Sequence, residues 1–401
     1  MVSKSRKLTA YTFHLFTLLF VYALFLPSGF AQNVVQWRVP DSDEVSLGAT
    51  TLNAITFSPD GSQIAVASPN GIALYDTYSG NTVTSFPILV DDVIALAISP
   101  SSEKEGGQTV AVASEEGIVH LWNARTGEHS ADFIGHTDPV VALAFSPDGN
   151  TLASGSFREV RLWNLTSEQT ARTAILQGHR DMVTTLVFSP DGRTLASTSF
   201  YGTILLWDVG TGQLRHSLSG HTDSIQALAF SPDNEILASG SYWHPDARST
   251  IRLWNPHTGR LLSTFEDHIT PVFALAFSPD IHSGTLASAG WGNSVRLWHP
   301  QTGQLQATFE GDAAPIVALR FLPDADGGIL ASASLDGTIQ LQSLTRVQIP
   351  ADVNGDGVVN ILDLTFVASR FGEASPDLNG DGIINILDLM LVANHFNQEL
   401  E

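Results

Sequence analysis

The chain has 401 residues, a formal net charge of −22 at pH 7 and no cysteine. The lack of cysteine excludes a disulfide framework and thiol chemistry. A polyanion of this size is not expected to bind nucleic acid or an anionic membrane surface. Composition and charge together suit a soluble extracellular or periplasmic protein.

The N-terminus has the layout of a secretory leader. Three basic residues among the first seven precede an apolar run over residues 11–27, and a Gly-Phe-Ala sequence ending at Ala31 follows as a cleavage site. The run is short and rich in threonine and tyrosine, which makes it a poor membrane span. We expect residues 1–31 to be a signal peptide and the mature chain to be secreted, periplasmic or at the cell surface, with no membrane span. An uncleaved anchor is the alternative.

A stretch of about forty residues, 178–219, sets the pattern for the middle of the chain. It holds four short apolar runs, at residues 183–188, 194–197, 203–207 and 213–218, separated by turn sequences such as Ser-Pro-Asp-Gly. Runs of this length, rich in β-branched residues and bounded by Gly, Pro and Asp, predict β-strands. Four such strands predict one small antiparallel sheet, which needs neighbours to bury both faces.

The pattern repeats every 41 to 47 residues. The phenylalanine of its FSPD motif, or a replacement, recurs at Phe57, Ile98, Phe145, Phe188, Phe230, Phe277 and Phe321. The third-strand aromatic recurs in step as Tyr75, Trp122, Trp163, Trp207, Trp254 and Trp298, with Gln342 at the seventh place. This period is typical of propeller blades.

With Gly-His before the first strand in three repeats and Leu-Trp at the end of the third strand, the chain resembles the WD40-repeat family over about residues 44–345. The resemblance implies an all-β, seven-bladed propeller, which we assign to residues 32–345. Ring closure would remove exposed sheet edges. We therefore expect residues 34–39 to supply the outer strand of the seventh blade, as in the family, with residues 346–349 as the competing segment.

The innermost strands predict how the blades pack. Two residues before each repeat phenylalanine stands Leu or Ile, and three residues before it stands Ala, or Thr once. Because alternate strand residues point to opposite faces, each sheet should present large side chains to one neighbour and small ones to the other.

The resemblance also implies a structural role for several histidines. In the family, a Gly-His histidine, a second-strand serine, a turn aspartate and the third-strand tryptophan form a hydrogen-bonded tetrad. The matching positions here are His136, His179, His221 and His268 for the histidine, and Trp163, Trp207 and Trp254 for the tryptophan. Glu159, Tyr201 and Asn293 stand near the aspartate position, and Asp336 alone matches it, so we expect packing to replace this network in some blades. Metal binding by these histidines is the alternative hypothesis. We favour the structural role, because each histidine lies in a different blade and they would not share one ion.

Aromatic residues gather in the loop after the second strand of four consecutive blades. They are Phe157, Phe200, Tyr201, Tyr242, Trp243 and Trp291. In the propeller topology these loops share one face with the loops that lead into the first strands. Clustered aromatics on one rim predict a surface that binds a protein or a glycan. The alternative is that the rings fold over the blade ends as local packing.

Catalytic signatures are missing. The innermost strands carry Asp92 and Arg320 as their charged residues, and no nucleophile elbow, zinc-peptidase motif or phosphate loop occurs. Paired carboxylates, as a propeller glycosidase would need, are not evident. We expect the chain not to be an enzyme, with a carbohydrate-active enzyme as the alternative.

The chain changes character at residue 350. A D-x-N-x-D-G-x-x-N-x-x-D loop begins at Asp352 and recurs 25 residues later. Oxygen ligands at positions 1, 3, 5, 7, 9 and 12, with glycine at position 6, are typical of an EF-hand-type calcium loop. The first loop would use Asp352, Asn354, Asp356, the carbonyl of Val358, Asn360 and Asp363. The second would use Asp377, Asn379, Asp381, the carbonyl of Ile383, Asn385 and Asp388. Two Ca²⁺ ions are therefore the expected cofactors.

Each loop runs into an amphipathic helical pattern, and no helix precedes it. This duplicated loop and helix resembles a type I dockerin over residues 351–401, after a short linker at residues 346–350. The resemblance implies docking to a cohesin-like receptor through Ile361, Leu362, Ile386 and Leu387. The short linker and a propeller as cargo depart from the usual pattern of such proteins. A calcium clip with a structural role is the alternative.

We interpret the whole as an exported, monomeric, non-catalytic interaction scaffold that carries a calcium-dependent docking module. Two other classes stay open. One is an accessory or catalytic component of extracellular polysaccharide degradation, and the other is a lectin-like binder.

Overall fold

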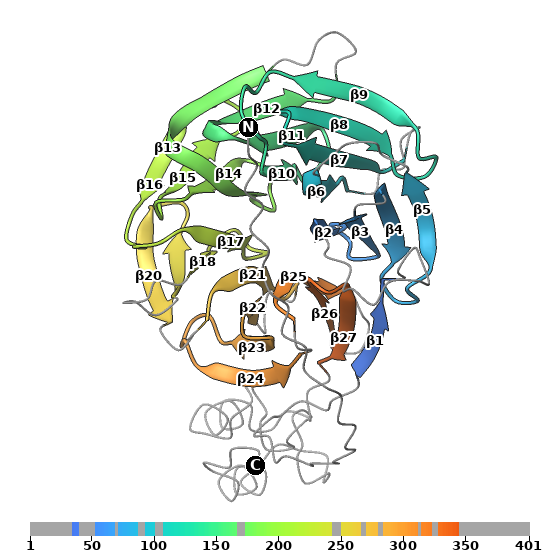
Figure 1. Cartoon of the computed structure of the whole chain (residues 1–401). Helices are drawn as coiled ribbons and strands as arrows, with labels where there is room; N and C mark the ends of the chain where they lie inside the picture. The colour runs from blue at the N-terminus through green and yellow to red at the C-terminus, as the bar shows by residue number, and fades with distance from the viewer. Residues whose placement is uncertain are drawn as a thin grey trace, which may run out of the picture.

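The computed structural model describes residues 34–39, 53–68, 71–86, 93–100, 107–166, 173–242, 250–265, 270–279, 284–311, 314–322 and 328–344. Within these ranges the chain is all-β, and antiparallel sheets are arranged around a ring (Figure 1). The expected leader, linker and C-terminal module lie outside the described residues, as do Asp92 and His268.

The strands group into four-stranded blades, numbered here in chain order. Blade 1 contains β2 (Ala54–Phe57), β3 (Gln63–Ser68), β4 (Gly71–Asp76) and β5 (Thr82–Phe86). Blade 2 contains β6 (Val93–Ile98), β7 (Thr109–Ser114), β8 (Ile118–Asn123) and β9 (His129–Ile134). Blade 3 contains β10 (Ala142–Phe145), β11 (Thr151–Gly155), β12 (Phe157–Asn164) and the first part of β13 (Thr173–Phe188). Blade 4 contains the last part of β13, β14 (Thr194–Ser199), β15 (Ile204–Asp208) and β16 (Leu214–Leu218).

The remaining strands complete the ring. Blade 5 contains β17 (Ile225–Phe230), β18 (Leu237–Ser241), β19 (Ile251–Asn255) and β20 (Arg260–Phe265). Blade 6 contains β21 (Val272–Phe277), β22 (Leu286–Gly290), β23 (Ser294–Trp298) and β24 (Leu305–Glu310). Blade 7 contains β25 (Ile316–Leu322), β26 (Ile329–Ser334), β27 (Thr338–Ser343) and β1 (Val34–Arg38). The innermost strands contact one another in sequence from β2 to β25, and β25 contacts β2.

Two blades share a strand. Residues 173–177 of β13 pair with β12, and residues 183–188 of the same strand pair with β14. The chain therefore stays extended through the Gly178-His179 sequence, where the sequence analysis placed the lead into a new strand. One continuous strand joins blades 3 and 4 into a seven-stranded sheet.

The N-terminal strand closes the ring. β1 pairs antiparallel with β27, so that it forms the outer strand of blade 7, the position expected for residues 34–39. The Trp37 Nε1–H group donates a hydrogen bond to the Thr77 carbonyl at 3.0 Å, and the Trp37 ring lies 5.9 Å from the ring of Tyr75. β1 thus also connects blade 7 with blade 1. The competing segment, residues 346–349, lies outside the described residues.

The packing predicted between blades is confirmed. Between blades 3 and 4, Ala142 packs with Leu186 and Phe188, and between blades 2 and 3, Ala95 packs with Leu143. The same combination of small and large inner-strand residues occurs at four of the other five interfaces. Between blades 4 and 5, Val187 is the inner-strand residue of blade 4 that packs with Leu228 and Phe230. Large side chains fill the space left by small ones where the strands converge, which gives close packing.

The recurring Ser-Pro-Asp sequence forms the turn after the innermost strand. In blade 4, Asp191 Oδ1 accepts hydrogen bonds from Ser189 Oγ at 2.6 Å and from the Arg193 N–H at 3.0 Å. The next residue, Gly192, has a φ of +71°, a conformation that favours glycine. Asn234 takes this position in blade 5 with a φ of +63°. The FSPD signature is therefore the chemistry of one tight turn, repeated.

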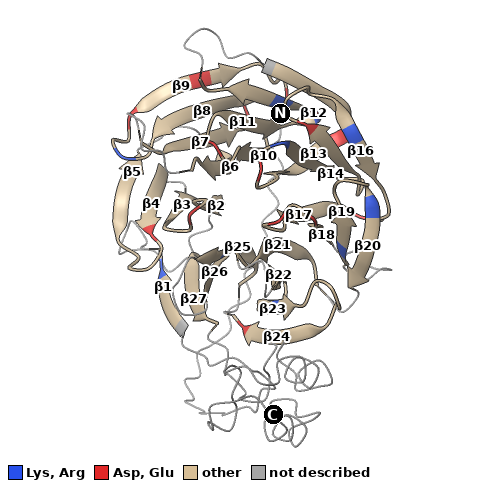
Figure 2. Cartoon of the chain, turned by 180° about the vertical axis from the view of Figure 1, so that it is seen from behind, with Lys and Arg blue, Asp and Glu red and all other residues tan. Residues whose placement is uncertain are grey.

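Charge is spread thinly over the described surface. Figure 2 shows acidic positions both on outer strands and in turns near the centre of the ring, with basic positions mostly towards the outside.

Candidate functional site

The aromatic residues predicted to form a binding rim are exposed where the structure describes them. The exposed fractions are 37% for Phe157, 57% for Phe200, 71% for Tyr201, 41% for Tyr242 and 58% for Trp291. Trp243 lies outside the described residues. None of the five described side chains is therefore buried as a cap over its blade.

Backbone hydrogen bonds place these loops at one end of the ring. After the second strand of blades 4 to 7, one N–H group donates to a carbonyl at or just before the start of the same blade's innermost strand segment. The pairs are Phe200 to Met182, Tyr242 to Ser224, Trp291 to Pro271 and Leu335 to Pro315. Each loop therefore lies beside the entry to its inner strand, as the propeller topology predicted.

Two of the predicted residues come together through a third that the sequence analysis missed. The Phe273 ring lies 6.0 Å from the Tyr242 ring and 6.2 Å from the Trp291 ring. Phe273 is half-buried on β21, and the other two are in the loops of blades 5 and 6. We call Tyr242, Phe273 and Trp291 the aromatic cluster. A signal for Phe273 exists, because the other repeats have Asn, Ile, Val, Thr or Gln four residues before the repeat phenylalanine or isoleucine.

Phe157, Phe200 and Tyr201 do not join this cluster: among the described residues no ring contact connects them to it. The Arg158 guanidinium instead lies 4.7 Å from the Phe157 ring, and a register shift in the strand pairing separates Phe157 from Glu159. Leu335, which the sequence analysis also missed, is 38% exposed at the same end of the ring.

A central cavity of about 330 Å³ opens between the inner strands. It is lined from blades 1, 2, 3, 4 and 7 by residues that include Ile55, Leu96, Thr184 and Leu335. The described lining residues carry no charged side chain. Arg320 of β25 lies near the Asp60 turn instead, and its burial lowers the pKa of the guanidinium. The described part of the channel offers no paired carboxylates for acid–base chemistry.

The histidines of the Gly-His sequences are structural, as expected. In blade 4, His179 Nε2 lies 2.6 Å from Ser197 Oγ, and the Trp207 Nε1–H donates to the same oxygen at 2.8 Å. Blades 3 and 5 repeat this arrangement with His136, Ser154 and Trp163 and with His221, Ser239 and Trp254. Because each histidine is buried in its own blade, the three cannot bind one metal ion together.

The other imidazole nitrogen finds different partners in different blades. His136 Nδ1 lies 2.8 Å from Glu159 Oε1, and His221 Nδ1 lies 3.3 Å from Thr250 Oγ1. His179 Nδ1 is buried and finds no hydrogen-bond partner among the residues that the structure describes. In blade 3, Glu159 on the third strand therefore stands where the family has a turn aspartate, whereas His179 in blade 4 has no such group beside it among the described residues.

Burial keeps these imidazoles neutral. It lowers the pKa of His179 to about 4, and burial together with the nearby Arg252 lowers the pKa of His221 to about 3. Burial also lowers the pKa of His136, although the Glu159 carboxylate opposes the shift.

The calcium-loop residues and the four apolar docking residues fall within 351–401, outside the described residues. The expected ligand set contains only carboxylate, amide and carbonyl oxygens, which fits Ca²⁺.

Comparison with known protein families identifies both parts of the chain. The WD domain, G-beta repeat model matches residues 127–164, 170–208, 212–255, 259–299 and 303–341. The Dockerin type I domain model matches residues 350–397. The five repeats cover half of the chain, and the structure has the blades they require, so the chain belongs to the WD40-repeat family.

Curated relatives match over part of their length. A WD repeat-containing protein of Synechocystis, sll1491, is 35% identical over 125 residues, which is 30% of this chain and 34% of that protein. Pre-mRNA-processing factor 19 homolog 2 of Arabidopsis thaliana is 27% identical over 136 residues, 32% of this chain and 25% of that protein. The COMPASS component SWD3 of Saccharomyces cerevisiae is 30% identical over 143 residues, 34% of this chain and 42% of that protein. The match therefore spans a quarter to two fifths of each of these relatives.

These findings define a class of protein. WD40 repeats indicate a protein-interaction scaffold and are generally non-catalytic. Type I dockerin domains bind calcium and occur mostly in extracellular proteins. Across the described ranges, no helix has the length and apolar character needed to cross a membrane.

Proposed function

We propose that this chain is an exported interaction scaffold whose propeller binds a protein partner at the aromatic cluster while its C-terminal module docks to a cohesin-like receptor. The carrying observation is the aromatic cluster itself. Tyr242 and Trp291 are 41% and 58% exposed on one end of a WD40 ring, and Phe273 connects them. Tryptophan and tyrosine are the residue types that most often dominate binding energy at protein interfaces.

Ring geometry favours a protein partner over a glycan. The Tyr242 and Phe273 rings are inclined by 37°, and the Phe273 and Trp291 rings meet edge to face at 70°. The rings therefore do not form one flat platform on which a sugar ring could stack. Angled aromatic faces suit the insertion of an apolar or cationic side chain.

The C-terminal module would supply the second attachment. Its two loops offer six oxygen ligands each, enough to bind two Ca²⁺ ions. A module of about fifty residues buries a small core, so calcium binding should provide much of its folding free energy. Ile361, Leu362, Ile386 and Leu387 would then present an apolar surface to the receptor. Export would follow from the leader at residues 1–31.

A role in polysaccharide degradation is the second candidate, and the Dockerin type I match at residues 350–397 favours it as an accessory role. The uncharged lining of the described channel gives no support for catalysis. The full chain can be assayed with calcium for hydrolysis of plant and algal polysaccharides. No hydrolysis would fit the scaffold function, whereas hydrolysis would overturn the interpretation that the chain is not an enzyme.

The proposed binding of a partner at the aromatic cluster is tested with Tyr242→Ala and Trp291→Ala variants, which are used to capture partners from the secreted fraction of the source. Tyr78→Ala is a matched control, because Tyr78 is also exposed, at 43%. The N–H group of the neighbouring Thr77 donates to the carbonyl of Ser62, in the turn after β2. This turn lies at the end of the ring opposite to the aromatic cluster. The two rim variants should lose a partner that the wild-type chain and the control retain. Retention of all partners by both rim variants would remove the aromatic cluster as a binding site. A glycan array in parallel identifies the lectin-like alternative, which would appear as sugar binding that Trp291→Ala abolishes.

A further inference from the structure

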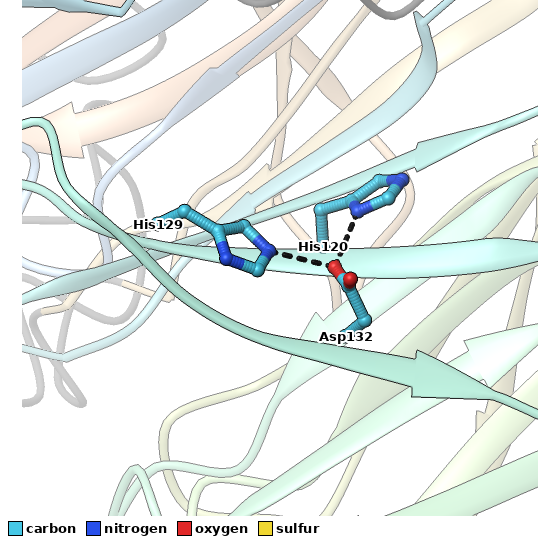
Figure 3. Close-up of side chains that lie close together, drawn as sticks. All are labelled: His120, His129 and Asp132. Carbon is cyan, nitrogen blue, oxygen red and sulfur yellow. Dashed lines mark hydrogen bonds and ion pairs between the residues drawn. The ribbon is translucent and has the colours of Figure 1, made fainter.

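Three metal-binding side chains lie together on the outer strands of blade 2 (Figure 3). His120 is on β8, and His129 and Asp132 are on β9, the outermost strand of this blade. His120 is directly opposite Asp132 in the strand pairing, and the register shifts between Leu121 and Trp122 next to His129. Two paired strands, rather than a loop, fix this arrangement.

One carboxylate oxygen connects both imidazoles. Asp132 Oδ1 lies 2.6 Å from His120 Nδ1 and 2.7 Å from His129 Nε2. One ligand atom from each of the three residues lies within 4.8 Å of the others. The side chains of His129 and Asp132 are 41% and 42% exposed, whereas that of His120 is 16% exposed. The group is therefore anchored on one side and open to solvent on the other.

The WD40 repeat itself does not require this group. The residues that occupy the place of His120 in the strand pairing of the other blades are Ala73, Arg161, Leu205, Arg252, Arg296 and Gln340. Blade 2 also has Val112 opposite His120, where blades 3 to 7 have serine. These histidines therefore lie apart from the histidine–serine–tryptophan network of the other blades.

We propose that His120, His129 and Asp132 bind a divalent transition-metal ion, for which Zn²⁺ is the best match. Two imidazole nitrogens and one carboxylate oxygen form a ligand set that zinc commonly takes. Ca²⁺ takes oxygen ligands, so this site is chemically distinct from the C-terminal loops. Three protein ligands leave a fourth position for water or for a side chain of a bound partner.

Only a small rearrangement is needed. Zinc with bonds of about 2.0–2.2 Å holds tetrahedral ligand atoms roughly 3.3–3.5 Å apart. Asp132 Oδ1 now lies closer than this to each imidazole nitrogen, because hydrogen bonds join them. The exposed side chains of His129 and Asp132 can open by less than about 1 Å to reach the tetrahedral separation. The Trp122 ring packs edge-on to His129 at 5.1 Å and limits the orientations of that imidazole.

Metal binding would also shift protons within the imidazoles. Each ring would bind through the nitrogen that now lies against Asp132 and would carry its proton on the other nitrogen. For His120 this is Nε2, which is buried and has no hydrogen-bond partner within the described part of the chain. The cost of that unpaired N–H group limits the affinity, so we expect weaker binding than in a closed four-ligand site.

The test is calorimetric titration of the full chain with Zn²⁺, in a buffer with excess Ca²⁺ so that the oxygen-ligand loops are already filled. The wild-type chain is compared with His129→Ala, Asp132→Asn and the control His257→Ala, which removes a histidine whose side chain is 55% exposed on blade 5. We expect one ion per chain in the wild type and the control, and an affinity at least about tenfold lower in the two site variants.

A second readout is the visible absorption of bound Co²⁺, which is intense for a tetrahedral site and weak for hydrated ions. The wild-type chain and the control should give the intense spectrum, and the two site variants should not. Circular dichroism establishes that both variants keep the β-sheet signal, which their exposed positions favour. Absence of binding in the wild type, or equal affinity in the wild type and both site variants, would overturn the proposal. Equal loss in the His257 control would overturn it as well.

Discussion

Oε1 of Glu159 lies 2.8 Å from Nδ1 of His136, and the same oxygen accepts a hydrogen bond from Arg161 Nε at 2.9 Å. A glutamate on the third strand of blade 3 thus takes the part that a turn aspartate has in the WD40 tetrad. Glu159 stands four residues before Trp163, and Thr250, which contacts His221, stands four residues before Trp254. Two blades therefore place a polar side chain beside a buried histidine from the same position, four residues before the third-strand tryptophan.

Replacement of Glu159 should destabilise blade 3. Glu159→Ala would remove the carboxylate that lies 2.8 Å from the buried Nδ1 of His136, and loss of a polar partner from a buried group costs about 1–3 kcal/mol. Thermal unfolding should show a lower midpoint for this variant than for the wild type. Glu116→Ala, which removes an exposed acid in the loop between β7 and β8 of blade 2, is the control and should leave the midpoint unchanged. Equal midpoints for Glu159→Ala and the control would contradict the assigned role.

In blade 4 a carboxylate can be introduced at the position from which it is removed in blade 3. Thr203 occupies the position of Glu159, but no described residue forms a hydrogen bond with His179 Nδ1. Thr203→Glu should raise the pKa of His179 from about 4 towards its usual value, because a nearby carboxylate favours the protonated imidazole. The measurement is an NMR titration of the His179 ring, with Thr203→Gln as the uncharged control. A pKa that stays the same in Thr203→Glu and Thr203→Gln would show that this strand position does not reach His179.

The buried histidines should make the fold sensitive to acid. In the unfolded chain each histidine binds a proton near about pH 6.5. In the folded chain His179 and His221 do so only at about 4 and about 3. Between the folded-state and unfolded-state pKa values, the unfolded chain binds more protons than the folded chain. The contribution of each histidine to the free energy of unfolding is therefore fully present above the unfolded-state pKa and decreases as the pH falls below it. The expected slope is about 1.4 kcal/mol per pH unit for each histidine.

Urea unfolding at a series of pH values measures this slope. His221→Gln, which removes one of the buried histidines with a lowered pKa, should flatten the dependence relative to the wild type, whatever its effect on absolute stability. A free energy of unfolding that is constant between about pH 5 and 7 would contradict the account.

Each of the two C-terminal loops should bind its own Ca²⁺ ion, so that a change in one loop leaves the other loop occupied. Asp356→Asn and Asp381→Asn each remove a carboxylate ligand, so each variant should bind one Ca²⁺ tightly where the wild type binds two. Calorimetric titration of the full chain with Ca²⁺ gives the stoichiometry. Asp191→Asn, in a tight turn of the propeller, is a control that keeps both loops intact. Wild-type stoichiometry in both loop variants would exclude these residues as ligands.

The sequence predicted the blades well because each repeated residue has a local physical task. Ser189 and Asp191 build a turn with atoms of their own loop, and alternation along one strand decides which inner residue meets which neighbour. These features depend on residues close in sequence, so their spacing is enough to identify them.

The site was harder to predict because it depends on contacts between blades. Phe273 lies 31 residues from Tyr242 along the chain, and its ring contact with Tyr242 arises from the packing of blade 5 against blade 6. The sequence placed Glu159 near the aspartate position of the tetrad, but the 2.8 Å approach of its side chain to His136 is a contact in space that repeat spacing does not show. Neither fact follows from the repeat pattern alone.

The central claim is that the chain is a scaffold with two attachment points, a propeller that binds one partner and a calcium-dependent module that binds another. Affinity capture from the secreted fraction of the source tests it most directly. The baits are the mature chain from Gln32 and a version that ends at Ile349, each with calcium and with a chelator. The account predicts one partner retained only by the full chain with calcium and a second partner retained by both baits in either condition. If both baits retain the same partners regardless of calcium, the C-terminal module does not dock and the claim is wrong.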